Sequence, residues 1–146
     1  MNDNLYIVIV DDDPAHIALI KRALKKCNLA KNIISFHSGQ QVLDFVYGNG
    51  EFNTQARPQQ ILILLDINMP GLNGIEVLKK LKNELTSQTI PVIMLTTSDD
   101  PTEIDTCLQL GCNAYLVKPI EQKSFADTIH RLKPSLTLTQ TPHTIP

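Results

Sequence analysis

The sequence predicts an α/β domain in which a parallel sheet carries helices on both faces, the doubly wound arrangement. Five short apolar runs alternate with five amphipathic segments along the 146 residues. The most apolar of these runs lack the polar alternation of a strand with one solvated face. Such strands are typical of parallel sheets, and alternating strands and helices require right-handed crossovers. The expected strands cover residues 5–10, 32–36, 61–65, 91–95 and 114–117.

Length and composition are those of one globular domain. Apolar residues make up 42% of the chain and the net charge is −2, so disorder and the basic excess of a nucleic-acid-binding protein are not expected. No apolar run approaches the ~20 residues of a membrane span. Three cysteines without metal-type spacing, and a start without a basic signal region, predict a cytoplasmic protein. The histidines interpreted as surface or helix residues are His16, His37, His130 and His143.

The five amphipathic segments have apolar residues at the helical spacing of about 3.6. In the first segment these residues are Ile17, Ile20 and Leu24, and in the third the apolar stripe extends to Leu85. The expected helices cover residues 14–26, 40–47, 75–85, 102–110 and 122–132.

Several helix starts are marked by capping residues. Asp13 before Pro14 and Asp100 before Pro101 pair an N-cap with a proline at the first helical position. Asp13 is therefore expected to cap the first helix rather than to bind a metal. Pairs three residues apart resemble capping boxes, and these are Asp100 with Glu103, Asn73 with Glu76, and Ser38 with Gln41.

Two segments are additional to the five strands and five helices that a minimal domain of this kind needs. Residues 48–60 form a polar stretch that is long for a loop in a compact domain, so we expect a functional or mobile insertion. Residues 133–146 are rich in threonine and contain three prolines. We expect a folded domain over residues 1–132 and a short tail over 133–146, with no output domain.

Polar residues follow four of the five expected strands. Because ligands of open parallel sheets bind beyond the carboxyl ends of the strands, we expect these side chains to form one site. They are Asp11, Asp12 and Asp13 after the first strand, Asp66 after the third, Thr96, Thr97 and Ser98 after the fourth, and Lys118 after the fifth.

The chemistry of this set favours phosphoryl transfer to a carboxylate. Carboxylates that lie close together repel one another, and a hard divalent cation such as Mg²⁺ removes that repulsion while accepting a phosphate oxygen. Lys118 would supply a fixed positive charge and Thr96 a hydroxyl donor. These groups are what an aspartate needs to become an aspartyl phosphate.

The same residues resemble the motifs of receiver domains, the response regulators of two-component signalling. The resemblance extends over residues 4–132, and the spacing of Asp66, Thr96 and Lys118 also matches. It implies a (βα)5 flavodoxin-like sandwich with strand order 2-1-3-4-5. The matching motifs are VDDDP at 10–14, LLDINMPG at 64–71 with Asn73 and Gly74, LTTS at 95–98, and YLVKP at 115–119.

The resemblance also implies the role of each site residue. Asp66 would be the phosphoacceptor, and Lys118 would pair with the phosphoryl group. Asp11, Asp12 and Asp66 would bind Mg²⁺ together with the backbone carbonyl of Asn68, and Mn²⁺ or Ca²⁺ could substitute in a crystal. All of these residues follow predicted strands.

A second group of residues would control the response. Thr96 and Tyr115 would form the switch, in which the hydroxyl moves toward the phosphoryl group and the ring turns inward. The peptide bond between Lys118 and Pro119 would be cis. The residues expected to tune access to Asp66 and phosphoryl lifetime are Asn68, Thr97 and Ser98.

The implied function is that of a single-domain response regulator phosphorylated by a sensor histidine kinase. It would catalyse only its own phosphorylation and dephosphorylation, and it would signal through protein contacts. The insertion and the tail resemble the small Rcp-type regulators paired with cyanobacterial phytochromes. That narrower resemblance implies a phytochrome kinase as partner, and a homodimer through the region that begins at Thr102 and ends at Leu132.

Three alternatives remain open. A magnesium-dependent phosphohydrolase of the haloacid dehalogenase type needs an acid two positions after its nucleophile, where this chain has Asn68. A flavodoxin-like electron carrier needs a phosphate loop where this chain has an acidic run. A degenerate receiver would act without phosphorylation, although the five expected positions are filled by Asp11, Asp12, Asp66, Thr96 and Lys118.

Overall fold

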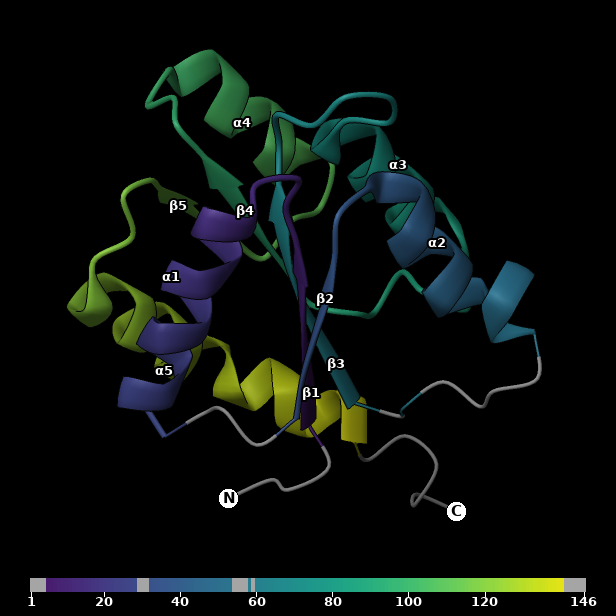
Figure 1. Ribbon diagram of the computed structural model, residues 1–146, viewed down its shortest axis with the longest axis horizontal. Coiled ribbons are helices and arrows are strands. Elements are labelled where there is room, and N and C mark those ends of the chain that lie inside the picture. The colour runs from purple at the N-terminus through teal and green to yellow at the C-terminus, as the bar shows by residue number, and fades with distance from the viewer. Residues whose placement is uncertain (1–4, 29–31, 54–57, 59, 141–146) are drawn as a thin grey trace.

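The computed structural model describes residues 5–28, 32–53, 58 and 60–140. Five parallel strands form one sheet in the order β2-β1-β3-β4-β5, which confirms the predicted topology (Figure 1). The strands are β1 (Leu5–Val10), β2 (Ile33–Phe36), β3 (Gln60–Asp66), β4 (Val92–Thr96) and β5 (Ala114–Val117). The helices are α1 (Pro14–Lys26), α2 (Gly39–Tyr47), α3 (Gly74–Asn83), α4 (Pro101–Gln109) and α5 (Gln122–Gln140), with a short 3₁₀ turn, η1 (Gly50–Phe52).

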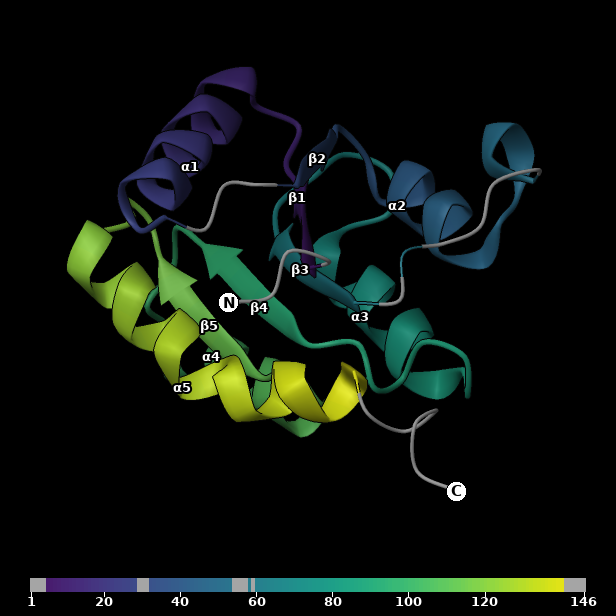
Figure 2. The same cartoon turned by 90° about the horizontal axis from the view of Figure 1, so that it is seen from below.

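Helices cover both faces of the sheet, as predicted. Successive residues of a strand point to opposite faces, so Ile7 and Ile9 of β1 pack with α1 and α5 while Val8 and Val10 pack with α2 and α3. Figure 2 shows α1 and α5 on one side of the sheet and α2 and α3 on the other. Among the described residues, no helix has both the length and the apolar character needed to cross a membrane.

The predicted helix caps are largely confirmed. The Asp13 carboxylate accepts a hydrogen bond from the Ala15 N–H at 2.9 Å, and Asn73 and Glu76 form the reciprocal capping box. The boxes predicted for Ser38 with Gln41 and for Asp100 with Glu103 are wrong. Ser38 accepts from the Gln41 N–H, but the Gln41 side chain accepts from the N–H of His37. Asp100 does cap α4, but its own N–H donates to the Ser98 hydroxyl, and the Glu103 carboxylate accepts from Thr96 instead.

The third helix ends earlier than predicted. It stops at Asn83, and Leu85 is 84% exposed rather than part of the apolar stripe. The Ser87 hydroxyl donates to the carbonyl of Leu81 at 2.7 Å, and the Gln88 N–H donates to the carbonyl of Glu84. The Ser87 hydroxyl thus satisfies the Leu81 carbonyl, which the N–H of Leu85 would satisfy in a longer helix, and the chain turns toward β4.

The last helix is longer than predicted. It continues past Leu132 to Gln140, and it reaches the end of β3 that lies opposite the carboxyl edge (Figure 1). Pro134, a residue type that normally interrupts a helix, does not end α5, so the expected helix end was wrong. Residues 141–146 of the expected tail lie outside the described residues.

The first part of the insertion is packed against the domain. Phe52 of η1 contacts Phe36 at a ring-centroid distance of 5.8 Å and Phe45 at 5.4 Å, both edge to face. Edge-to-face contacts of this kind stabilise aromatic clusters. Residues 54–57 and 59 of the insertion lie outside the described residues.

Gly74 brings the start of α3 against the carboxyl end of β3. Its N–H donates to the Ile67 carbonyl at 2.8 Å. A Cβ at this position would overlap the carbonyl oxygen of Asp66 and lie 2.7 Å from the Cα of Ile67. Glycine therefore allows the close approach that sets the path of the chain after Asp66.

Replacing Gly74 with alanine should lower the free energy of unfolding by about 3 kcal/mol, since the added methyl group meets backbone rather than a movable side chain. Denaturant unfolding followed by circular dichroism measures the loss. Gly71→Ala is the control, because its Cβ would meet no atom within 4 Å and only the left-handed φ of 74° would cost about 1 kcal/mol. Equal losses in the two variants would contradict the close packing of Gly74.

Candidate functional site

Three carboxylates meet at the carboxyl edge of the sheet. Ligand oxygens of Asp11, Asp12 and Asp66 all lie within 4.8 Å of one another. β1 and β3 are neighbours paired with Val10 opposite Leu65, so the residues that come next, Asp11 and Asp66, end side by side. Asp11 and Asp66 are buried, whereas Asp12 is exposed to solvent.

Lys118 joins the two buried carboxylates. Its ammonium nitrogen lies 2.8 Å from Asp11 Oδ2 and 3.0 Å from Asp66 Oδ1. The backbone of Lys118 is held by a hydrogen bond of 2.7 Å from its N–H to the carbonyl of Thr96. The peptide bond between Lys118 and Pro119 is cis in the structure, the isomer that the resemblance implied.

Burial and neighbouring charges shift the pKa values of Asp66 and Lys118. Burial raises the pKa of Asp66, the hydrogen bond and charge of Lys118 oppose that rise, and the charges of Asp11 and Asp12 add to it. Burial alone would lower the pKa of Lys118, but its hydrogen bonds to Asp11 and Asp66 outweigh burial and raise it. Lys118 therefore remains an ammonium ion and favours the ionised form of Asp66.

The donor set fits a hard divalent cation. Three carboxylates face one ammonium group, so the cluster keeps an excess of negative charge that a divalent ion would balance. Carboxylate oxygens are the ligands that Mg²⁺, Mn²⁺ and Ca²⁺ prefer. Asp12 is exposed at the rim of the cluster, which leaves an open side for water or a phosphate oxygen.

Thr96 lies buried at the end of β4, and its hydroxyl has two partners. It donates to Glu103 Oε1 of α4 at 2.8 Å and accepts from the N–H of Ser98 at 2.9 Å. Tyr115 belongs to the edge strand β5 and is 36% exposed. The two predicted switch residues therefore lie on neighbouring strands, with Thr96 inside the protein and the Tyr115 ring toward solvent.

The residues predicted to tune the site lie around it. Asn68 is exposed two positions after Asp66, and Thr97 is exposed directly after β4. Ser98 is half-buried, and its hydroxyl accepts from the N–H of Asp100 at 3.1 Å. The structure thus places these three residues in the two loops that follow β3 and β4.

Sequence reasoning missed two residues at the site. His16, interpreted as a surface or helix residue, has its Nδ1 atom 2.9 Å from the Lys118 nitrogen and 3.5 Å from Asp11 Oδ2. Glu103, expected in a capping box, contacts Thr96 instead. Their places in the first turns of α1 and α4 were the available signal, because both helices start at the carboxyl edge of the sheet.

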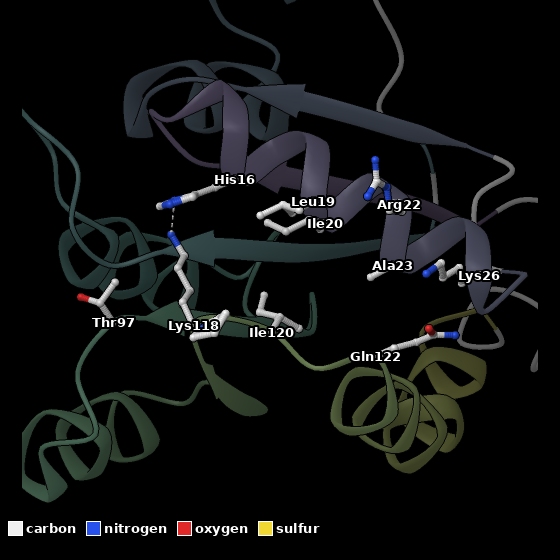
Figure 3. Close-up of a pocket in the computed structure, with 11 residues that line it drawn as sticks. His16, Leu19, Ile20, Arg22, Ala23, Lys26, Thr97, Lys118, Ile120 and Gln122 are labelled. Atoms are coloured by element: carbon white, nitrogen blue, oxygen red, sulfur yellow. Dashed lines mark hydrogen bonds between the residues drawn. The ribbon is translucent and has the colours of Figure 1, made fainter.

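A cavity of about 360 Å³ lies beside Lys118, between α1 and the loop from β5 to α5 (Figure 3). Leu19, Ile20 and Ile120 form its apolar wall, and Arg22 and Lys26 lie further along α1. Thr97, Lys118 and His16 line the end nearest the carboxylates, where the close-up shows the contact between Lys118 and His16.

Comparison with known proteins agrees with the geometry of the site. The family model for the response regulator receiver domain matches residues 7–130. Response regulator Rcp1 of Synechocystis is 34% identical over 112 residues, which cover 77% of this chain and 75% of Rcp1. The resemblance to Rcp-type regulators is therefore confirmed as a sequence similarity.

Solved structures of related regulators share the fold. The bacteriophytochrome response regulator RtBRR has a TM-score of 0.78 at 35% identity, covering 88% of this chain and 77% of that chain. The Mn²⁺-bound form of Rcp1 has a TM-score of 0.72 at 30% identity, covering 88% and 91%. The phosphorylated cyanobacterial phytochrome response regulator RcpA has a TM-score of 0.74 at 29% identity, covering 92% and 94%.

The family match spans most of the chain and includes the three clustered carboxylates, Thr96 and Lys118. It selects receiver domains over the phosphohydrolases and flavin carriers that share a doubly wound sheet. This chain belongs to the response regulator receiver domain family.

Proposed function

We propose that the protein accepts a phosphoryl group on Asp66 from a sensor histidine kinase and signals by changing its contacts with other proteins. The observation that carries this proposal is the Lys118 ammonium group, which bonds to Asp66 and Asp11 within a cluster of three carboxylates. Receiver-domain response regulators are signalling proteins, and receiver domains bind Mg²⁺ at an acidic cluster.

In the proposed reaction, a carboxylate oxygen of Asp66 attacks the phosphorus of the donor phosphohistidine. A phosphorus–oxygen bond forms, the phosphorus–nitrogen bond breaks, and its electron pair stays on the donor imidazole. Lys118 would hold Asp66 ionised beforehand and then offset the negative charge of the phosphoryl oxygens. The groups that would hold Mg²⁺ are Asp11, Asp12, Asp66 and the Asn68 carbonyl, and the bound ion would neutralise part of the same charge.

Thr96 and Tyr115 would report the new charge. The Thr96 hydroxyl would move to donate to a phosphoryl oxygen, and the Tyr115 ring would turn into the space behind it. The support for this step is that Thr96 is buried at the carboxyl edge while Tyr115 is 36% exposed on the adjacent strand. The charge added at Asp66 would thereby select between two arrangements of Thr96 and Tyr115.

Access and lifetime would depend on the loops around Asp66. Thr97 lines the cavity beside Lys118, so its side chain would narrow the approach of water or of a donor. Asn68 is exposed two positions after Asp66 and would face an attacking water. Ser98 would act on Thr96, because its backbone N–H donates a hydrogen bond to the Thr96 hydroxyl.

The donor would dock over α1. The cavity beside Lys118 combines an apolar wall with the positive charges of Arg22 and Lys26, and it opens next to the phosphoacceptor. The similarity to RtBRR, RcpA and Rcp1 supports a phytochrome kinase as this donor. The cytoplasmic location and the lack of nucleic-acid binding stay predictions from the sequence.

A homodimer would use the opposite part of the molecule. Leu108 on α4 and Tyr115 and Val117 on β5 are large apolar side chains exposed within the predicted interface. Tyr115 is itself one of the two switch residues, so a change in its ring position would alter that surface directly.

Incubation with acetyl phosphate and Mg²⁺ should add one phosphoryl group to the protein, measured by intact mass at neutral pH. The Asp66→Asn variant should gain none because it lacks the nucleophile. Asp13→Asn is the matched control: it removes a neighbouring negative charge, and asparagine still caps α1, so the mass gain should persist.

Light scattering on the same samples tests whether phosphorylation changes the assembly. Failure of the wild-type protein to gain mass, with acetyl phosphate and also with a phosphorylated kinase, would reject the proposal in favour of a receiver that acts without phosphate.

Lys118→Met should slow phosphorylation by acetyl phosphate at least about tenfold, since the ammonium group no longer offsets the phosphoryl charge. The same change should tighten divalent-ion binding, measured by calorimetric titration, because the ion no longer competes with a cation at Asp11 and Asp66. Lys123→Met, at an exposed lysine of α5, is the control and should change neither quantity. Unchanged ion affinity in Lys118→Met would contradict the shared site.

Leu19→Asp should slow transfer from a purified, phosphorylated bacterial phytochrome kinase about tenfold while leaving the reaction with acetyl phosphate unchanged. Leu19 is 59% exposed at the cavity, so a charge there would weaken docking without touching Asp66. Leu108→Asp, at another exposed leucine on α4 (46% exposed), should keep the wild-type transfer rate. Slowing by both variants, or by neither, would contradict docking over α1.

A further inference from the structure

The first turn of α4 contacts the switch threonine directly. The Thr96 hydroxyl donates to Glu103 Oε1 at 2.8 Å, and Thr96 is 1% exposed while Glu103 is half-buried. A hydrogen bond to a carboxylate is stronger than one between neutral groups, and burial of the donor strengthens it further. The contact therefore fixes the rotamer of Thr96.

A hydroxyl has one proton to donate. While the proton of Thr96 is given to Glu103, it cannot be given to a phosphoryl oxygen on Asp66. The two acceptors, a carboxylate and a phosphoryl group, are both anionic and compete for the same donor. Thr96 must leave Glu103 before it can bind the phosphorylated site.

The contact is part of a chain of bonds that leads into α4. The Thr96 hydroxyl accepts from the N–H of Ser98, and the Ser98 hydroxyl accepts from the N–H of Asp100 at 3.1 Å. Asp100 in turn caps α4 by accepting from the N–H of Thr102 at 3.0 Å. Release of Thr96 would disturb the loop and the helix start together.

We propose that Glu103 is a positioning residue that holds Thr96 in its unphosphorylated arrangement. The inference rests on the proposed function, since it concerns how Thr96 becomes available to the phosphoryl group. Glu103 lowers the fraction of molecules whose Thr96 is free to donate. The apparent affinity for a phosphoryl group falls in proportion to that fraction. Because Glu103 belongs to α4, the release of Thr96 is also linked to the position of that helix.

Glu103 has a simpler role that must be separated from this one. A glutamate in the first turn of a helix stabilises the helix through its dipole, and this effect needs no contact with Thr96. The capping box that would explain Glu103 locally is not formed, because the N–H of Asp100 is bonded to Ser98. Asp105 lies on the same helix, is exposed, and contacts Gln109, so it offers a matched charge change.

The test measures binding of beryllofluoride, a noncovalent mimic of the phosphoryl group, to the full chain in the presence of Mg²⁺. Tyrosine fluorescence or amide NMR shifts give the half-saturation concentration. Glu103→Ala should lower that concentration at least about tenfold, the effect of one lost charge-assisted hydrogen bond. Glu103→Gln keeps an acceptor oxygen and should fall in between, whereas Asp105→Asn should match the wild type.

The decisive comparison repeats Glu103→Ala in a Thr96→Val background, which removes the hydroxyl and keeps the branched shape. If Glu103 acts through Thr96, its effect should vanish there. An effect that persists, or no effect in the wild-type background, would overturn the proposal. Wild-type protein that binds no beryllofluoride at all would instead reject the proposed function, so the two failures are distinguishable. Thermal unfolding of each variant verifies that it is folded.

Discussion

The ammonium group of Lys118 lies between two buried carboxylates, and the rest of the site depends on this ion pair. Asp11 directly follows β1 and Asp66 is the last residue of β3, and both strands are buried where they end, so the two side chains start inside the apolar part of the domain. An unpaired carboxylate there would cost several kcal/mol or take up a proton. Lys118 contacts both acids from the end of β5, a strand that does not adjoin β3, and its charge opposes the rise that burial causes in the pKa of Asp66.

The paired strands hold the two acids and Lys118 with little freedom to move. Parallel pairing aligns the ends of β1, β3, β4 and β5 at one edge, and the contact at Gly74 holds the chain after Asp66 against α3. The apolar core behind the edge is close-packed and would resist displacement. Chemistry at Asp66 is therefore expected to change the polar contacts of the loops and leave the strands in place.

The polar contacts around Asp66 lie in two directions, toward α1 and toward α4. On one side, the cavity over α1 opens beside Lys118 and His16, where a phosphodonor would approach. On the other side, Thr96 leads through Glu103 and Ser98 to the start of α4 and to the exposed side chains of α4 and β5. Under the proposed function, the donor would contact α1 and the loop after β5, and the dimer partner would contact the exposed side chains of α4 and β5.

The order of strands and helices, most caps, and the carboxylates with Lys118 were all predictable before the structure. Each depends on local periodicity or on the rule that strand ends share one edge, and both can be recognised along the chain. The early end of α3, the continuation of α5 past Leu132, and the partners of His16 and Glu103 were not predictable in this way. Glu103 has the spacing of a capping box, yet its carboxylate bonds to Thr96. A side chain with two possible partners takes the one that packing brings within reach, and only the folded chain decides which partner that is.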